Sequence, residues 1–249
     1  MRLADEYRRQ LAWRPWAALL DALPLAPGQL VLDLGCAAGD VAAMLVARGA
    51  RVIGVDLNAE LLDEARAREL ASADFRLADL RQPLELGAPA DGVWSSFTAA
   101  YLPDLTAALR AWAGLLRPRG FVAVTEVDDL FAHEPLAPRT RELLQAYAAA
   151  AARAGRYDFQ MGRKLAEHLT RAGLRVTRTL TPADRELAFD GPALPEVAVA
   201  WAQRFERMKL LHEFCGAEYP AVRDDFLTCL GRADHHARAR VVCCVAVAA

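Results

Sequence analysis

Four aspartates stand where short apolar runs end in the first eighty residues, and their carboxylates could hold a cation or accept hydroxyl groups. Asp33 and Asp40 flank the turn in VLDLGCAAGD, a stretch that predicts a buried strand, a turn of small residues and a helix. Asp56 lies in GVDLN and Asp79 in LADL. Carboxylates accept hydrogen bonds and attract positive charge, so this set favours a ligand with a cationic centre and hydroxyl groups.

The turn after the first strand does not suit a dinucleotide. A diphosphate-binding turn needs Gly-x-Gly-x-x-Gly before its helix, and the three positions here hold Gly35, Ala37 and Asp40. A negative charge at Asp40 would occupy the helix N-terminus where a pyrophosphate binds, and Asp33 would repel it as well. A nicotinamide-dependent dehydrogenase is therefore disfavoured.

The remaining acids favour a nucleoside. Asp56 closes the second predicted strand, where a carboxylate can accept both hydroxyls of a ribose. Asp79 closes the third and can accept a proton from an exocyclic amino group, while the backbone N–H of Leu80 meets a ring nitrogen. An adenosine with a cationic amino-acid tail is S-adenosylmethionine.

Alternating strands and helices must position these residues. Strands are predicted over 29–35, 51–57, 74–80, 91–97, 117–127, 174–180 and 239–249, and helices over 40–49, 58–70, 104–116, 139–155 and 162–173. This order predicts an α/β fold, a doubly wound, seven-stranded and mostly parallel sheet. Ligands bind such sheets at the carboxyl ends of the strands.

The stretch 182–238 is too long for a loop, and its apolar spacing is helical. It predicts a helical cap inserted before the last strand of a single domain, 1–249. The apolar stripe Trp201, Phe205 and Met208 within it is predicted to be core.

Five segments in order, VLDLGCAAG, GVDLN, FRLADL, DGVWSSF and LLRPRGFVAVTEV, resemble the motifs of the class I S-adenosylmethionine-dependent methyltransferases. The resemblance covers about residues 25–180 and the last strand. It implies a Rossmann-like sheet whose last strand is antiparallel and lies between the fifth and sixth. It also implies that residues 1–24, including Tyr7, Trp13 and Arg14, form a lid.

The resemblance further implies roles for single residues. Gly35 and Gly39 form the turn against the methionine part of the cofactor, and Asp33 lies near its ammonium group. The cofactor-binding set that follows is Asp33, Gly35, Cys36, Gly39, Asp56, Leu57, Asp79, Leu80, Ser95, Ser96 and Phe97, of which the last three flank the sulfonium. The family often has glycine where this chain has Ala37, and the added methyl narrows the approach to the backbone.

The segment SSFTAAYLPD lacks the Asn/Asp-Pro-Pro-Tyr signature of enzymes that methylate DNA bases or protein amides. Ser95 and Ser96, and an Asp128–Asp129 pair without asparagine, disfavour the metal-dependent catechol type, so no metal is predicted. A small-molecule methyltransferase remains, with O- or N-methylation in secondary metabolism and natural product biosynthesis. The alternative is a cofactor-binding protein that transfers no methyl, either a cyclase-like catalyst or a regulatory subunit.

Four side chains are candidates for a general base at the rim of the site. They are Tyr101, Glu126, His133 and His212, and we favour His133, in the loop after the fifth strand. His235 and His236 are predicted to be solvated.

Composition narrows the partners. The chain has 249 residues, 54% of them hydrophobic, and a net charge of −2, so it lacks the basic surplus that nucleic acid requires. No apolar run of membrane-spanning length and no signal peptide occurs, which predicts a cytoplasmic protein. Five cysteines without a Cys-x-x-Cys pair predict reduced, buried thiols. The expected partner is a small-molecule substrate, and a homodimer stays open.

Overall fold

The structure is a computed structural model that describes residues 3–85 and 87–248. Its strands are β1 (Leu30–Leu34), β2 (Arg51–Asp56), β3 (Ala73–Leu77), β4 (Ala90–Ser96), β5 (Leu116–Asp128), β6 (His133–Glu134), β7 (Arg175–Leu180), β8 (His236–Ala237) and β9 (Arg240–Val247). Its α-helices are α1 (Leu3–Gln10), α2 (Trp16–Asp21), α3 (Asp40–Ala47), α4 (Ala59–Arg66), α5 (Leu105–Ala113), α6 (Pro138–Arg153), α7 (Met161–Arg171), α8 (Pro195–Arg207), α9 (Lys209–Cys215) and α10 (Tyr219–Leu230). Short 3₁₀ helices are η1 (Leu11–Trp13), η2 (Ala99–Tyr101) and η3 (Gly216–Glu218). Residues 1–2 of the expected lid and residue 249 of the expected last strand lie outside the described part.

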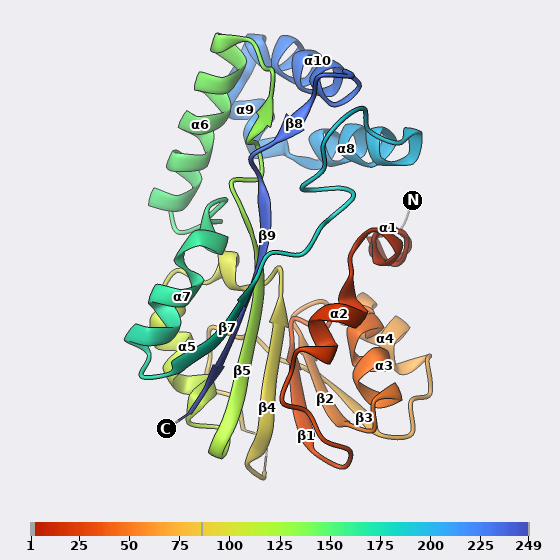
Figure 1. Ribbon diagram of the computed structural model, residues 1–249, viewed down its shortest axis with the longest axis vertical. Coiled ribbons are helices and arrows are strands. Elements are labelled where there is room, and N and C mark those ends of the chain that lie inside the picture. The colour runs from red at the N-terminus through yellow and green to blue at the C-terminus, as the bar shows by residue number, and fades with distance from the viewer. Residues whose placement is uncertain (1–2, 86, 249) are drawn as a thin grey trace.

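Seven strands form one sheet in the order β3-β2-β1-β4-β5-β9-β7 (Figure 1). The strands from β1 to β5 pair in parallel, and β9 is antiparallel to both of its neighbours, β5 and β7. The predicted α/β fold, with the last strand inserted between the fifth and sixth of the sheet, is confirmed.

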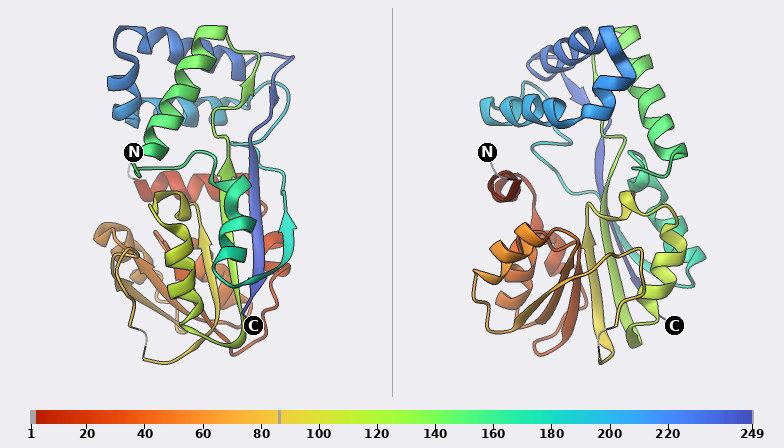
Figure 2. Two further views of the ribbon diagram at one scale, coloured as in Figure 1. Left: turned by 90° about the vertical axis from the view of Figure 1, so that its left-hand side faces the viewer. Right: turned by 180° about the vertical axis from the view of Figure 1, so that it is seen from behind.

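Helices cover both faces of the sheet, with α2, α3 and α4 on one face and α5 and α7 on the other (Figures 1 and 2). Side chains alternate along a strand, so Leu32 and Leu34 of β1 pack in the core on the α5 face. Val31 packs in the core on the α3 face. The same alternation directs Asp33 toward α3, although the residue is as buried as its apolar neighbours. A buried carboxylate is costly unless a polar or charged group is its partner, and the apolar neighbours of Asp33 cannot be that partner.

A second group of helices, α6, α8, α9 and α10, lies beyond the carboxyl ends of β4 and β5; we call it the helical layer (Figure 1). Its core contains the fully buried side chains of Trp201, Phe205 and Phe226. The apolar stripe of the predicted cap is thus core, with Met208 packed half-buried against it. The layer also includes α6, which precedes the predicted cap, and a two-stranded β6–β8 sheet that the sequence did not indicate.

Two of the differences from the predicted boundaries have local reasons. The third strand ends at Leu77, because the Asp79 carboxylate accepts the Arg81 N–H and starts a turn. The helical pattern around Met208 splits into α8 and α9, since Met208 leaves the helical region at φ −78° and ψ 61°. Asp79 and Leu80 therefore lie in a turn rather than in a strand.

All five cysteines are buried free thiols, as predicted. Across residues 3–85 and 87–248, none of the helices combines the length and the apolar character needed to cross a membrane.

Candidate active site

The turn between β1 and α3 has a left-handed backbone at three positions. Gly35, Ala37 and Gly39 have φ values of 82°, 47° and 73°. A Cβ on Gly35 would lie 2.0 Å from the Thr98 hydroxyl oxygen, so only glycine fits there. Ala37, at the position where the family often has glycine, adopts the conformation that glycine favours. The turn therefore allows a ligand at the carboxyl end of β1 to approach the backbone closely.

Asp33 is a buried acid with an unused oxygen. The residue is 1% exposed, and its Oδ2 has no hydrogen-bond partner. Burial, and then the nearby charge of Asp56, raise the pKa of Asp33 to about 7, although the Ala42 backbone N–H opposes the shift. A cation placed here would stabilise the ionised carboxylate.

Asp56 shapes the turn and keeps free acceptor capacity. Its Oδ2 accepts the Ala37 N–H at 2.8 Å, and its Oδ1 accepts the Asn58 N–H at 2.9 Å. Each carboxylate oxygen has a second lone pair, so two further donors can bind. Within the described residues Asp56 has no ion pair.

The other two acids of the predicted set are already neutralised. Asp40 is paired with Arg68, whose Nε also binds the Ala38 carbonyl. Asp40 does begin helix α3, as expected, but Arg68 compensates its charge there. Asp79 is paired with Arg81, which lowers the pKa of Asp79 to about 2. Of these four aspartates, Asp33 and Asp56 are the two that have no ion pair within the described residues.

The end of β4 lies beside this turn. The Ser95 hydroxyl donates to the Leu34 carbonyl at 2.9 Å, and the Ser96 carbonyl accepts the Thr98 hydroxyl. Phe97 has φ 52°, a conformation that is uncommon outside glycine and is found at functional sites. The structure thus brings the 95–97 segment next to the glycine turn.

The remaining members of the predicted cofactor set differ in exposure. Cys36 is buried, and Leu57, directly after Asp56, is 61% exposed. Leu80 is half-buried against the core on the α5 face. Of these three side chains, only Leu57 is largely open to a ligand.

A buried ionic network joins the N-terminal helices to the helical layer. Glu186, fully buried, binds Arg14 Nη2 at 2.7 Å and Arg204 Nη2 at 2.6 Å. Arg14 also contacts Asp184 at 3.3 Å and lies over the Phe97 ring at 4.9 Å. The sequence analysis named Arg14 as part of a lid but missed its partners. These come from segments 170 or more residues away, and no local pattern links them.

His133 does not lie at a solvent-accessible rim. It is buried among the Trp201, Phe226 and Phe189 rings, and its Nδ1 is 2.9 Å from His235 Nε2. Burial, and then His235, lower the pKa of His133 to about 3. His133 is therefore a neutral side chain within the helical layer, which argues against the favoured base.

The other histidine predictions have different outcomes. His235 is 2% exposed, so its predicted solvation was wrong; it pairs with His133 and the Gly191 carbonyl. His236 is exposed, as predicted. His212 is exposed on α9, where its ring centre lies 4.5 Å from that of Tyr219, in the helical layer away from the glycine turn (Figure 1).

Tyr101 and Glu126 do lie at the carboxyl edge. Tyr101 is 59% exposed, and its ring contacts that of Tyr157 at 4.7 Å. Glu126, on β5, is fully buried, and its Oε1 accepts the Ala100 N–H at 2.9 Å while its Oε2 has no partner. Burial raises the pKa of Glu126 to about 8. Of the four candidate bases, these two are beside the end of β4.

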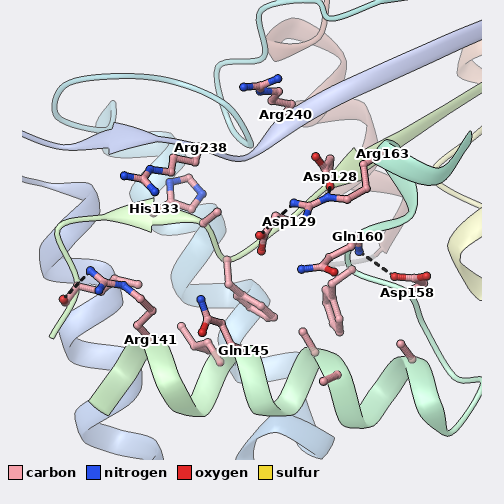
Figure 3. Close-up of a pocket in the computed structure, with 18 of the residues that line it drawn as sticks. Asp128, Asp129, His133, Arg141, Gln145, Asp158, Gln160, Arg163, Arg238 and Arg240 are labelled. Carbon is pink, nitrogen blue, oxygen red and sulfur yellow. Dashed lines mark hydrogen bonds and ion pairs between the residues drawn. The ribbon is translucent and has the colours of Figure 1, made fainter. Parts of the chain in front are cut away.

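A cavity of about 500 Å³ lies elsewhere, between α6 and the ends of β5 and β6 (Figure 3). Its wall includes Asp128 and Asp129, the acids considered for a metal, and both are paired with Arg163. None of the predicted cofactor residues lines this cavity. Within the described part of the chain, no group of three or more His, Cys, Asp or Glu side chains could hold a metal ion.

The sheet order with antiparallel β9, together with the glycine turn and the two unpaired acids at its edge, defines the class I methyltransferase fold. Comparison with known proteins agrees, since residues 31–120 match the methyltransferase domain family. Residues 31–120 therefore carry a methyltransferase domain of the class I type, a family whose cofactor is S-adenosylmethionine.

Two curated relatives share part of the chain. Trans-aconitate 2-methyltransferase of Methylobacterium radiotolerans is 38% identical over 55% of this chain and 50% of the relative. Nocamycin O-methyltransferase of Saccharothrix syringae is 36% identical over 48% of this chain and 44% of the relative. The chain thus spans about half the length of the curated relatives it matches.

Solved structures share the fold over most of the chain. The [4+2]-cyclase SpnF has a TM-score of 0.62 and 18% identity, covering 94% of this chain and 80% of its own. A geranyl diphosphate methyltransferase in complex with SAM has a TM-score of 0.57 and 19% identity, covering 94% and 84%. At these identities the likeness concerns the fold alone.

Proposed function

We propose that the protein transfers the methyl group of S-adenosylmethionine to an oxygen or nitrogen atom of a small molecule. The observation that carries this proposal is the pair of unpaired acids, Asp33 and Asp56, on either side of the glycine turn. Asp56 has the two free lone pairs that ribose hydroxyls require, and Asp33 has the unused buried oxygen that an ammonium group requires. Asp79 and Leu80 would then face the adenine.

The surroundings of the site support a small acceptor. The helical layer stands above the ends of β4 and β5 and would act as the cap, with the N-terminal helices as the lid (Figure 1). Trp13 packs in the core of the layer, and Arg14 ties the same segment to Glu186. A compartment closed on two sides excludes water and aligns a small nucleophile with the methyl group.

The names of the relatives also support a small molecule as the methyl acceptor. Trans-aconitate and nocamycin are small molecules, and the second name supports a role in secondary metabolism. In-line displacement from a sulfonium needs alignment above all, and a base only when the acceptor must lose a proton.

The test is turnover. The purified protein is incubated with S-adenosylmethionine and a panel of small acids, phenols and amines, and S-adenosylhomocysteine is quantified by mass spectrometry. The proposal expects acceptor-dependent formation of S-adenosylhomocysteine, abolished by Asp56→Ala. Binding of S-adenosylmethionine without turnover on any acceptor would instead favour the cyclase-like or regulatory alternative. A melting temperature raised by NAD but not by S-adenosylmethionine would contradict both.

A further inference from the structure

The cavity of about 500 Å³ beside α6 is a second compartment of the molecule (Figure 3). Its walls come from α6, from the ends of β5 and β6, from the first turn of α7 and from residues 238 and 240 beside β9. The helices α6 and α7 lie on the opposite side of the molecule from α1, α2, α3 and α4, and the glycine turn leads into α3 (Figures 1 and 2). The cavity is thus separate from the glycine turn, and its volume is typical of sites for small molecules.

One face of α6 forms a long wall of this cavity. The residues that line it recur at spacings of three and four, as residues on one helix face do. Arg141 and Gln145 come first along the helix, and Ala148, Ala149 and Ala152 follow. Their small side chains leave the space open, and the stretch from Arg141 to Ala152 runs about 16 Å along the helix axis. This wall is therefore cationic at one end and apolar along the rest.

Aromatic side chains continue the apolar part of the cavity. Phe131 and Phe159 both line it, and their ring centres lie 4.9 Å apart. Leu136 and Leu144 line it as well. A ligand whose body is apolar would remove this surface from water and gain free energy from its burial.

At one end of the cavity the charges are compensated inside the protein. Arg163 is paired with both Asp128 and Asp129, and Lys164 is paired with Asp158 at 2.6 Å. Burial is the largest cause of the raised pKa of Asp129, so its surroundings oppose a second negative charge beside Asp128. A cationic ligand would therefore have to compete with Arg163 and Lys164 for these acids.

The other arginines of the cavity have weaker compensation. Figure 3 shows Arg141 and Arg238 on the side away from Arg163. Arg238 lies 3.5 Å from Glu134, which also contacts His236 at 3.3 Å. Arg141 donates only to a backbone carbonyl, at 3.4 Å. Within residues 3–85 and 87–248, neither Arg141 nor Arg240 is paired with an acid. Guanidinium groups without a carboxylate attract an oxyanion, which their forked N–H groups match in shape.

We propose that this cavity binds a small organic anion, with its oxyanion head at Arg141 and its apolar body along the alanines of α6. The ligand would contact α6 of the helical layer together with the end of β5 and the start of α7, so it would bridge the layer and the sheet. It is bound and not methylated there, because the cofactor residues do not line the cavity. The inference is thus independent of the methyl-transfer function.

The first experiment is isothermal titration calorimetry on the full chain. Hexyl phosphate and hexanoate are compared with hexan-1-ol, which keeps the apolar body and removes the charge. The inference expects at least one anion to bind at a single site per chain and the alcohol not to bind. The anion that binds more tightly shows whether the site favours a phosphate or a carboxylate head.

The same titration is repeated with S-adenosylhomocysteine bound. The affinity for the anion should change less than about twofold, since the two sites are separate. Competition between the two ligands would overturn the inference, because the anion would then occupy the glycine turn. Absence of binding by both anions at millimolar concentration would overturn it as well. Neither result would affect the methyltransferase function.

The second experiment places the anion in the cavity. Arg141→Gln should weaken binding about 10- to 100-fold, as expected for the loss of a charged hydrogen bond. Arg153→Gln, exposed on the same helix and outside the cavity, is the charge-matched control. Ala149→Phe fills the cavity without a change of charge and should abolish binding. Ala146→Phe, exposed on another face of α6, is its control. Wild-type affinity in either Arg141→Gln or Ala149→Phe would contradict the inference.

Discussion

The sheet edge and the helical layer both bury charged groups, but they treat them differently. At the edge, Asp33 and Asp56 keep acceptor capacity and have no cationic partner within the described residues. In the layer, Glu186 is saturated by two arginines, so its charge is fully compensated inside the protein. The comparison teaches that the acids without ion pairs lie at the candidate ligand site, whereas the paired buried charge of Glu186 holds two segments together.

The layer should lose the most stability when its pairing is broken. Glu186→Ala removes the carboxylate that pairs with Arg204 and leaves Arg14 with Asp184 alone, so it should cost about 3–5 kcal/mol of unfolding free energy. Thermal or denaturant unfolding measures the loss. Glu218→Ala is the control, because it breaks an exposed pair with Arg139 and should leave the unfolding free energy nearly unchanged. Equal losses in the two variants would refute the distinction between buried and exposed pairs.

At the sheet edge, we expect a side chain added to the glycine turn to lower the affinity for the cofactor. Gly35→Ala places a Cβ against Thr98 at a left-handed residue, so we expect cofactor affinity to fall about 10-fold or more. Gly28→Ala shares the positive φ but meets no atom within 4 Å, and it should bind the cofactor normally. A Gly35→Ala protein that binds as well as Gly28→Ala would show that the turn is not part of the site.

Glu126 should make stability depend on pH. Its pKa is raised from 4.5 to about 8, mainly by burial, so the folded state holds its proton between these values while the unfolded state releases it. Stability from this group is therefore full below about pH 4.5 and is lost as pH rises to about 8, by about 1.4 kcal/mol per pH unit. Tyr101, Tyr157 and Asp158 face the same carboxyl and stay in both proteins.

Glu126→Gln removes this titration, so the melting temperature of the wild type should fall relative to the variant between pH 5 and 8. Differential scanning calorimetry across that range measures it. Parallel pH profiles for the two proteins would contradict the burial of a titrating carboxyl at this position.

The smallest effect on cofactor binding is expected at Asp79, the acid of the sheet edge that is already paired with an arginine. Asp79 is half-buried and its charge is already paired with Arg81, so Asp79→Asn should weaken cofactor binding less than about 10-fold, as measured by calorimetry. A larger loss would mean that Arg81 releases Asp79 when adenine binds, which would sharpen the comparison by moving Asp79 into the group of ligand-binding acids.

The two regions also differ in how far the sequence alone could predict them. The edge is built from short contiguous motifs in which strand, turn and acid follow one another, so the fold and residues such as Asp33, Gly35 and Asp56 could be placed before the structure. The layer depends on contacts between distant segments. No spacing rule links Arg14 to Glu186 or His133 to His235, and burial lowers the pKa of both histidines. Arg68 could not be foreseen as the partner of Asp40 for the same reason.

Isothermal titration calorimetry of S-adenosylmethionine into the wild type and Asp56→Ala tests the central claim most directly. Loss of two charge-assisted hydrogen bonds should weaken binding about 100-fold or more. Asp63→Ala, which removes an exposed acid of the neighbouring helix α4, should bind like the wild type. No heat from S-adenosylmethionine with the wild type, or equal affinity in Asp56→Ala, would contradict the claim that the unpaired acids of the sheet edge hold this cofactor.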